Sequence, residues 1–420
     1  MDKVEYVEKI KEMKVLLINK YYYIKGGAEV CFFSLKNLLE KKHYNIVPFS
    51  MKDSRNFYTE YNEYFVNNID YNNLNLFKKI IAAIKIIYNF EAKRKISKLI
   101  KDTKPDIAHI HNFYHQLSPS ILNPIKKKNI PIIFTVHDLK VICPNYQMLN
   151  SNGICEKCRG KKFYNCIRYK CVKNSRINSL VVVFEAYIHE ILKSYNLVDI
   201  FITPSRFLRD KLIEYGFEKD KVRYIPNFVN VYEYVPYYGF DNYYIYFGRL
   251  SYEKGIMNLI QAAKNINKIP LLIVGSGPVL NEIRRYIEQE NIKNIYLKGF
   301  KTGEELKNLI SKSKFVVMPS ICYENNPMSV IESMAYGKAV IGSNIGGIPE
   351  LINNKELLFN YNDISSLEEK INYMINLTRE DIEKIGKDNR KYIEDNCSEE
   401  IHYEKLSKIY DEVRNKSKGQ

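Results

Sequence analysis

Short apolar runs alternate with amphipathic stretches of helical length along most of this 420-residue chain. The first run, Lys14–Ile18, predicts a buried strand, and a loop and a helix over 28–41 follow it. Strands that alternate with helices are typical of βαβ units, and therefore of parallel sheets. Further strands are predicted at 107–111, 132–137, 200–204, 222–226, 243–248, 271–274, 294–299, 315–319, 339–342 and 356–359.

These strands form two series of similar size, which predict an α/β protein with two Rossmann-like domains. The length agrees, because it exceeds what a single hydrophobic core usually serves. A loop rich in Tyr and Asn over 227–240 separates the two series. We therefore expect one domain over 1–228, a second over 229–397, and a terminal helix within 398–420.

The net charge of +16 comes entirely from the first part of the chain. Residues 1–240 contain 39 Lys and Arg against 23 Asp and Glu, whereas residues 241–420 contain 25 of each kind. A one-sided basic surface suits an anionic membrane leaflet or an anionic substrate. The alternative is a solvated basic face. No zinc-finger, RNP or helix-turn-helix signature accompanies the charge, which argues against nucleic acid.

An amphipathic stretch over 74–101 carries an apolar face surrounded by Lys and Arg; the apolar residues are Phe77, Ile80, Ile81, Ile84, Ile87 and Tyr88. Such a helix lies in a lipid interface or packs its stripe on the core of the first domain. The charged N-terminus, 1–13, does not resemble a signal peptide. No run approaches the ~20 apolar residues of a membrane span. We expect a cytoplasmic protein, with a peripheral association with the inner face of the membrane.

Glycines and cations follow the first predicted strand of each domain. Gly26 and Gly27 precede a helix whose free N–H groups suit a phosphate, although a Gly-Gly pair is more often only a turn. Arg249 and Lys254 follow the strand at 243–248, at the carboxyl end where open α/β sheets bind ligands. An Arg and a Lys together neutralise a diphosphate, although two such cations also occur on ordinary surfaces.

Two carboxylates frame a predicted helix that begins near Pro327. Glu324 lies in the loop before this helix, and Glu332 lies more than one turn inside it. Both can accept hydrogen bonds from the hydroxyls of a sugar or a ribose. The alternative is an acid favoured by the helix dipole together with a solvated acid further along.

Histidines end two predicted strands of the first domain. His137 ends the strand at 132–137, where it can hydrogen-bond a substrate hydroxyl or carbonyl, although a lone histidine is more often structural. His109, His111 and Asn112 end the strand at 107–111. We expect these side chains to line the same cleft as His137.

Four cysteines fall within 17 residues of a Lys-rich insertion that we place at 143–171: Cys155, Cys158, Cys166 and Cys171. Their spacing is shorter than that of common zinc fingers, but it favours a tetrahedral structural zinc site. Cys143 is a substitute ligand. Four unrelated reduced thiols are the alternative interpretation.

Taken together, these motifs resemble those of the family 4 glycosyltransferases (glycosyl transferases group 1), which have the GT-B fold. The resemblance spans nearly the whole chain, and the Glu324-x7-Glu332 pattern is its most diagnostic part. The other matching segments are 26–29, 135–138, 204–207, 225–227, 248–251, 254–255 and 274–278.

The resemblance implies a retaining glycosyltransferase, of hexosyltransferase type in EC 2.4. Such an enzyme moves a sugar from a nucleotide-diphosphate sugar to a saccharide or lipid-linked acceptor, here in surface polysaccharide biosynthesis. The implied domains face each other across a cleft, with the acceptor on the first, the donor on the second, and the terminal helix returning to the first. Catalysis needs no cofactor, and the absence of an Asp-x-Asp motif agrees, because fixed cations replace the metal.

The resemblance also implies a role for each site residue. The diphosphate is approached by Gly26 and Gly27 and bound by Arg249 and Lys254. Glu324 holds the sugar hydroxyls, Glu332 holds the ribose, and His137 lies beside the transferred sugar and the acceptor. The backbone of Asn326, Pro327, Met328 and Ser329 cradles sugar and phosphate, and residues near Gly275 and Phe300 border the base. Many relatives have Gly-Phe or a similar pair after the first Glu, so the sugar is left open.

Three other functions compete. A dehydrogenase needs a Gly-x-Gly-x-x-Gly turn, whereas 274–278 offers two glycines followed by proline. A nucleotide-sugar epimerase of similar fold is a closer alternative, which sugar transfer to an added acceptor would exclude. A non-catalytic subunit of a polysaccharide-assembly complex is the third, and the intact Arg249, Lys254, Glu324 and Glu332 argue against it.

Overall fold

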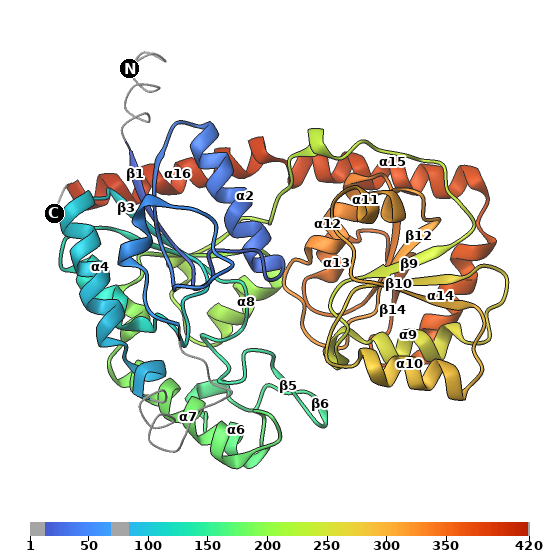
Figure 1. Ribbon diagram of the computed structural model, residues 1–420, viewed down its shortest axis with the longest axis horizontal. Coiled ribbons are helices and arrows are strands. Elements are labelled where there is room, and N and C mark those ends of the chain that lie inside the picture. Colours follow the sequence, from blue (N-terminus) through green and yellow to red (C-terminus); the bar gives the residue numbers. More distant parts are fainter. Residues whose placement is uncertain (1–12, 69–83, 419–420) are drawn as a thin grey trace. The chain divides into compact units, whose positions relative to one another are not determined.

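The computed structural model describes residues 13–68 and 84–418, and the contacts of the chain divide it into two compact units. Unit 1 comprises Met1–Pro204, Leu208–Ile225 and Tyr403–Gln420, as far as these residues are described. Unit 2 comprises Ser205–Phe207 and Pro226–His402. Each unit contains a six-stranded sheet with helices packed around it (Figure 1). The chain thus leaves the first unit after Ile225 and rejoins it at its end.

The sheet of unit 1 is parallel throughout and has the order β2-β1-β3-β4-β7-β8. Its strands are β1 (Lys14–Ile18), β2 (Asn45–Phe49), β3 (Ile107–Ile110), β4 (Ile132–Thr135), β7 (Ile200–Thr203) and β8 (Val222–Tyr224). Most of their residues are buried and apolar, as in sheets covered on both faces. The sequence pattern missed β2 because it contains Pro48; β2 is an edge strand, where the missing N–H is tolerated.

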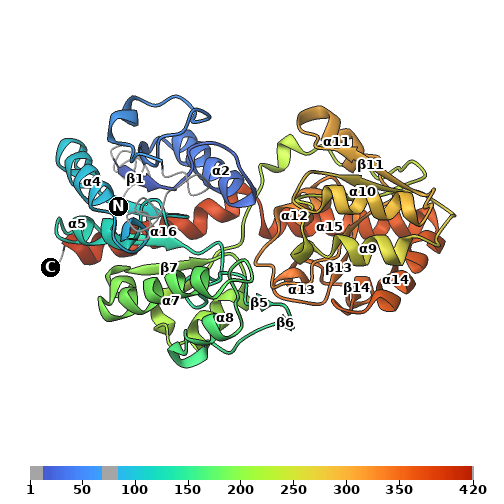
Figure 2. The ribbon, with the colours of Figure 1, turned by 60° about the horizontal axis from the view of Figure 1, so that its bottom comes forward.

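The helices of unit 1 include α2 (Gly27–Lys41), α4 (Phe90–Thr103), α5 (Leu122–Lys126), α7 (Arg176–Ile191) and α8 (Arg206–Glu214), the last beginning in the Ser205–Phe207 segment of unit 2. Seen from a second direction, they lie on both sides of the sheet (Figure 2).

The amphipathic stretch expected over 74–101 is not one continuous helix. Its first part, 74–83, lies outside the described residues. Helix α4 starts after Asn89, whose Oδ1 accepts a hydrogen bond of 3.1 Å from the Ala92 N–H. Ile96, Leu99 and Ile100 of α4 are buried, whereas Phe90 at its start is 68% exposed. Helix α4 therefore packs on the core of unit 1. Of the predicted apolar face, Ile84 is exposed, and Ile87 and Tyr88 are half-buried.

The sheet of unit 2 is also parallel, with the order β11-β10-β9-β12-β13-β14. Its strands are β9 (Tyr244–Phe247), β10 (Leu271–Val274), β11 (Ile295–Gly299), β12 (Phe315–Met318), β13 (Ala339–Ser343) and β14 (Leu358–Phe359). All six coincide with predicted strands. The helices are α9 (Ile256–Ala263), α10 (Leu280–Gln289), α11 (Gly303–Ser311), α12 (Met328–Ala335), α13 (Ile348–Leu351), α14 (Ile364–Asn376) and α15 (Arg379–Asn396).

The last helix, α16 (Glu399–Lys418), packs from Tyr403 onward on unit 1. The buried Tyr410 has its hydroxyl 2.7 Å from Nδ1 of His109 in β3. Nearer the end of α16, Ser417 Oγ donates a 2.7 Å hydrogen bond to the carbonyl of Asn129. The two parallel α/β sheets give the chain the GT-B fold. In the described part of the chain, no helix combines the length and apolarity needed to cross a bilayer.

Candidate functional site

In unit 2, Lys254 and Glu324 meet at the carboxyl ends of two neighbouring strands, β9 and β12. Lys254 Nζ lies 2.5 Å from Glu324 Oε1. Ser320 Oγ donates a 2.6 Å hydrogen bond to the same oxygen. Sequence reasoning named the two charged residues but missed Ser320, whose only signal was its place directly after a predicted strand.

Gly255 brings the segment that carries Lys254 close to the end of β12. Its φ of 66° lies in the left-handed region, and a Cβ there would sit 1.8 Å from the carbonyl oxygen of Pro319. Any other residue would push the two loops apart. The 2.5 Å ion pair therefore depends on a glycine next to the lysine.

The two cations of this segment differ in their partners. Burial alone would lower the pKa of Lys254, but Glu324, with Cys322 and Glu253, outweighs burial and raises it, so Lys254 remains an ammonium. Arg249 is exposed, and in the described part of the chain its guanidinium has no ion pair. Its backbone is fixed by Tyr246, whose hydroxyl donates a 2.7 Å hydrogen bond to the Arg249 carbonyl. The site thus offers one paired cation and one open cation.

Helix α12 begins beside this ion pair, with Pro327 as its N-cap. The N–H groups of its first turn, beginning with Met328 and Ser329, have no acceptor within the helix and can bind an anion. Asn326 is buried, and its Oδ1 accepts a 2.9 Å hydrogen bond from the Asn227 N–H. Asn227 Nδ2 also donates a 2.8 Å hydrogen bond to the Asn326 carbonyl, so both the side chain and the carbonyl of Asn326 fix the loop.

Glu332 lies one turn inside α12 and is partly buried. Burial raises the pKa of its carboxyl group to about 7. Near neutral pH the group is therefore divided between a carboxylic acid and a carboxylate. A raised pKa of this kind is more frequent in functional sites than on ordinary surfaces.

The glycine segment after β13 supports the Glu324 loop. The Gly347 N–H donates a 2.7 Å hydrogen bond to the Glu324 carbonyl. A Cβ on Gly347 would sit 1.7 Å from the Asn325 carbonyl oxygen. Glu350 accepts hydrogen bonds from the N–H groups of Arg206 and Phe207, at 2.8 and 2.6 Å. These contacts hold the Glu324 loop in place, and the N–H of Gly347 is used in them.

Gly275 and Phe300 follow the neighbouring strands β10 and β11. The Gly275 N–H donates a 2.8 Å hydrogen bond to the Gly299 carbonyl, which places Phe300 beside this point. Gly275 is buried, whereas the Phe300 ring is 70% exposed. An exposed aromatic ring at a strand end is available to stack on a flat ligand.

In unit 1, three histidines form a continuous series at the ends of β3 and β4. His111 Nδ1 lies 2.8 Å from His137 Nε2, and the two rings stack with centroids 5.0 Å apart. The His109 ring lies 4.9 Å from that of His111, and its Nε2 lies 2.8 Å from Thr135 Oγ1. Burial lowers the pKa of His137 to about 4, so its imidazole is neutral at physiological pH. The structure thus brings together the histidines that the sequence placed on two strands.

Gly26 and Gly27 form the exposed N-terminus of α2 in unit 1. Gly26 has an extended backbone, and a Cβ there would meet nothing closer than Glu29 Oε2 at 3.9 Å. Packing within unit 1 therefore does not require a glycine at this position. Glu29, in the first turn, is buried, and burial raises the pKa of its carboxyl group.

Three of the four predicted zinc ligands lie in one small cluster. Cys158 and Cys166 are buried among Phe163 and the α7 residues Val182 and Val183, and the partly buried Cys171 packs against them. Burial, together with the neighbouring Cys143, Cys155 and Cys171, raises the pKa of the Cys158 thiol to about 12. Over 13–68 and 84–418, no group of three or more His, Cys, Asp or Glu side chains is arranged to hold a metal ion. The zinc site remains a prediction for metal analysis, and no function here depends on it.

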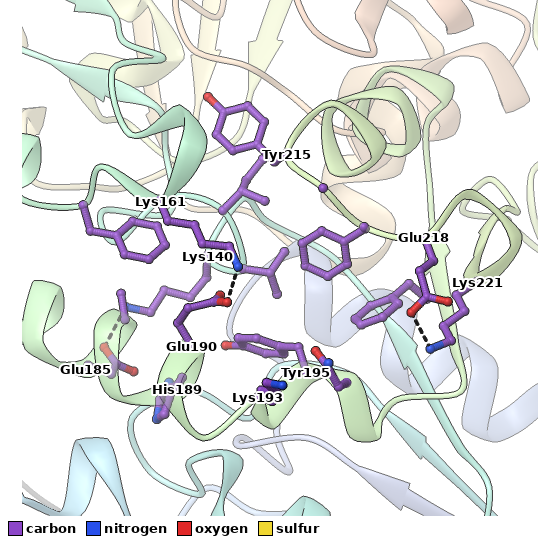
Figure 3. A pocket seen from close by; sticks show the side chains of 18 residues that line it. Lys140, Lys161, Glu185, His189, Glu190, Lys193, Tyr195, Tyr215, Glu218 and Lys221 are labelled. Carbon is purple, nitrogen blue, oxygen red and sulfur yellow. Dashed lines mark hydrogen bonds and ion pairs between the residues drawn. The ribbon is translucent and has the colours of Figure 1, made fainter.

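A cavity of about 310 Å³ in unit 1 was not predicted from the sequence (Figure 3). Helix α7 forms one wall, and the segments after β4 and α8 form others. Its lysines are largely neutralised. Lys140 forms a buried 2.8 Å ion pair with Glu185, Lys161 pairs with Glu190, and Lys221 pairs with Glu218 at 2.8 Å. The cavity therefore keeps little charge to attract a diphosphate.

Two family models match successive parts of the chain. The model described as Glycosyltransferase Family 4 matches residues 25–233, and the model described as Glycosyl transferases group 1 matches residues 237–392. Together they cover most of both units, and the second covers Arg249, Lys254, Glu324 and Glu332.

Individual proteins agree with these matches. An uncharacterized glycosyltransferase of Methanocaldococcus jannaschii is 26% identical over 96% of this chain and 99% of its own length. The O-antigen chain mannosyltransferase C of Escherichia coli is 28% identical over 37% of this chain and 42% of its own. The Anabaena protein HepE, solved with UDP and glucose, superimposes with a TM-score of 0.63 at 15% identity, over 95% of this chain and all of its own.

Proposed function

Because the chain belongs to the family 4 glycosyltransferases, we propose that it moves a sugar from a nucleoside-diphosphate sugar to a saccharide or lipid-linked acceptor. The observation that carries this proposal is the group formed by Lys254, Glu324 and Ser320 beside the exposed Arg249. Cations at the carboxyl ends of parallel strands, next to a helix N-terminus, suit a diphosphate. The relatives that act in O-antigen synthesis or bind UDP support the same class of reaction.

The donor is held by unit 2 in this proposal. Arg249 and Lys254 bind the diphosphate and stabilise the charge that develops as it leaves. Glu324 accepts hydrogen bonds from sugar hydroxyls through the oxygen lone pairs that Lys254 and Ser320 leave open. The carboxylate of Glu332 accepts from the ribose hydroxyls, the backbone of 326–329 cradles sugar and phosphate, and Phe300 with Gly275 borders the base.

The transfer itself proceeds with retention. The bond between the sugar C1 and the diphosphate oxygen breaks, and a bond from the acceptor oxygen to C1 forms on the same face. The leaving phosphate oxygen takes the acceptor proton. Glu324 is a poor nucleophile for the alternative double displacement, because Lys254 and Ser320 already bind its Oε1. His137, neutral at physiological pH, donates or accepts a hydrogen bond at the sugar or the acceptor.

A thermal-shift screen over UDP-, GDP- and ADP-sugars tests donor binding, since a ligand that binds only the native state raises the melting temperature. We expect one nucleotide class to stabilise the wild type and to lose that effect in Arg249→Ala. If no nucleotide sugar shifts the melting temperature, or if Arg249→Ala responds like the wild type, the donor assignment fails.

A further inference from the structure

Helix α7 lies at the margin of unit 1 (Figures 1 and 2). Several of its apolar side chains are exposed. Ile177, Phe184 and Ile191 recur every seven residues, so they share one side of the helix. These three side chains are 76%, 57% and 76% exposed. The outer face of α7, as we use the term, consists of Ile177, Leu180, Val181, Phe184, Ile188 and Ile191, each exposed or partly exposed.

The opposite face of α7 already has its partners. Val182 and Val183 pack on the cysteine-rich insertion, and Glu185 forms the buried ion pair with Lys140. Glu185 and His189 line the cavity of unit 1 (Figure 3). A surface helix normally carries polar residues outward, whereas the outer face of α7 carries no charged residue. Its exposed apolar side chains therefore need an occupant from outside the described chain.

The apolar surface continues at the end of the helix, where Leu192, directly after α7, is 55% exposed. On the opposite face of α7, His189 Nε2 lies 2.9 Å from the Ile87 carbonyl oxygen, and Ile84 in the same short segment is 52% exposed. Contiguous exposed apolar surface of this kind marks an interaction site.

Cations flank the outer face at both ends of the helix. Lys170, Lys173 and Arg176 are exposed before and at its start, and Lys193 is exposed just after its end. Within the described ranges none of these four side chains has an ion pair. The two acids of α7 are neutralised by lysines, Glu185 by Lys140 and Glu190 by Lys161. The outer face is thus an uncharged apolar strip with a basic border.

We infer that the outer face of α7 is the surface by which unit 1 docks on an anionic membrane. A helix that lies in a lipid interface buries an apolar face in the acyl boundary while basic residues contact anionic headgroups. A second copy of the chain fits less well, because a symmetric dimer would pair the same patch with itself and bring the cationic borders together. The inference goes beyond sugar transfer and involves no residue of the donor site.

Cosedimentation of the full chain with vesicles tests this inference. The vesicles contain phosphatidylcholine alone or phosphatidylcholine mixed with phosphatidylglycerol. We expect the wild type to bind the mixed vesicles and to dissociate as salt rises. Phe184→Glu should weaken binding by more than about tenfold. It removes an aromatic ring that the bilayer would bury, and it adds a charge. Lys173→Ala should weaken it by roughly fivefold, the effect of one cation near an anionic surface.

Val235→Glu is the matched control, since it also places a carboxylate at an apolar site that is 75% exposed, but in unit 2. It should bind vesicles like the wild type, and the melting temperatures of all variants should agree. Equal binding by Phe184→Glu and the wild type would overturn the inference. So would a dimer in size-exclusion chromatography that Phe184→Glu dissolves without any vesicle binding. Donor-induced thermal shifts should survive in Phe184→Glu, which separates this outcome from a failure of the proposed transfer.

Discussion

Unit 2 has an ion pair at the carboxyl ends of its strands, whereas unit 1 has three imidazoles there, of which that of His137 is uncharged at physiological pH. Lys254 and Glu324 form a close ion pair with the exposed Arg249 nearby. In unit 1, His111 and His137 are hydrogen-bonded to each other, and burial holds the pKa of His137 near 4. In the proposed reaction, the fixed charge of unit 2 binds the diphosphate, and the neutral imidazole of unit 1 hydrogen-bonds hydroxyl groups.

The largest effect is expected from removing the paired cation of unit 2. Lys254→Ala should lower kcat by roughly 10²–10³-fold, as when one preorganised donor to a developing anion is lost. The kcat is measured from the steady-state release of the nucleoside diphosphate. Lys391→Ala, in the same unit and with a side chain 77% exposed, is the control and should be fully active. If the kcat of Lys254→Ala stays within a few-fold of the wild-type value, the charged groups of unit 2 do not have the role that sets them apart from the histidines of unit 1.

A smaller effect is expected from the neutral site of unit 1. His137→Ala should lower kcat by about tenfold, the effect of one lost hydrogen bond, and His137→Asn should restore part of it. Because the pKa of His137 is about 4, the rate should show no titration near the usual histidine value. A rate that follows an ionisation near pH 6.5, and that loses it in His137→Asn, would show that His137 acts as a charged group.

Glu332 should make donor binding depend on pH. Its carboxylate form predominates only above its pKa of about 7, so donor affinity should rise severalfold as pH increases through that value. Titration calorimetry at several pH values measures this, and Glu332→Gln should show a flat profile. An affinity that falls with pH in the wild type would contradict the proposed role in holding the ribose.

The same pKa has the opposite effect on folding. A carboxyl group whose folded pKa is raised binds its proton more tightly in the native state, so the free energy of unfolding should decrease as pH rises from the unfolded value of 4.5 toward 7. Glu332→Gln should remove this decrease, as measured by denaturant unfolding across the range. Parallel stability profiles for the two proteins would place the raised pKa in doubt.

The smallest effect on transfer is expected from Tyr410→Phe in α16. The substitution removes the hydroxyl 2.7 Å from His109 and leaves a buried imidazole nitrogen without that partner. The free energy of unfolding should fall by about 1–3 kcal/mol, while kcat changes little. Denaturant unfolding together with the transfer assay separates the two. A kcat loss as large as that of His137→Ala would give Tyr410 a direct part in the reaction.

Much of the fold could be predicted from the sequence because buried parallel strands appear as short apolar runs between helices. Every strand of unit 2 was found in this way, including β9 and β12, which present Lys254 and Glu324. In unit 1, strand β2 was not predicted because Pro48 interrupts its apolar pattern. The ends of the strands then indicated where the site residues lie, since the carboxyl ends of parallel strands meet at one edge of the sheet.

Contacts between distant segments could not be predicted. The hydrogen bond between His109 and Tyr410 joins residues 301 positions apart, and no local sequence pattern predicts it. Helix α7 was missed as a surface because its run of Val, Phe and Ile does not show which of these side chains the folded chain covers. The amphipathic pattern over 74–101 drew attention to α4, whose stripe is buried. Only the exposures in the folded chain distinguish the two helices.

The central claim is sugar transfer at the site around Glu324, and a transfer assay with Glu324→Ala tests it most directly. Transfer from the stabilising nucleotide sugar to an added saccharide acceptor is followed as nucleoside diphosphate released and glycoside formed. We expect the wild type to transfer, Glu324→Ala to lose activity by ~10²-fold or more, and Glu304→Ala, whose side chain is 80% exposed, to match the wild type. Full activity in Glu324→Ala with an unchanged melting temperature would contradict the account.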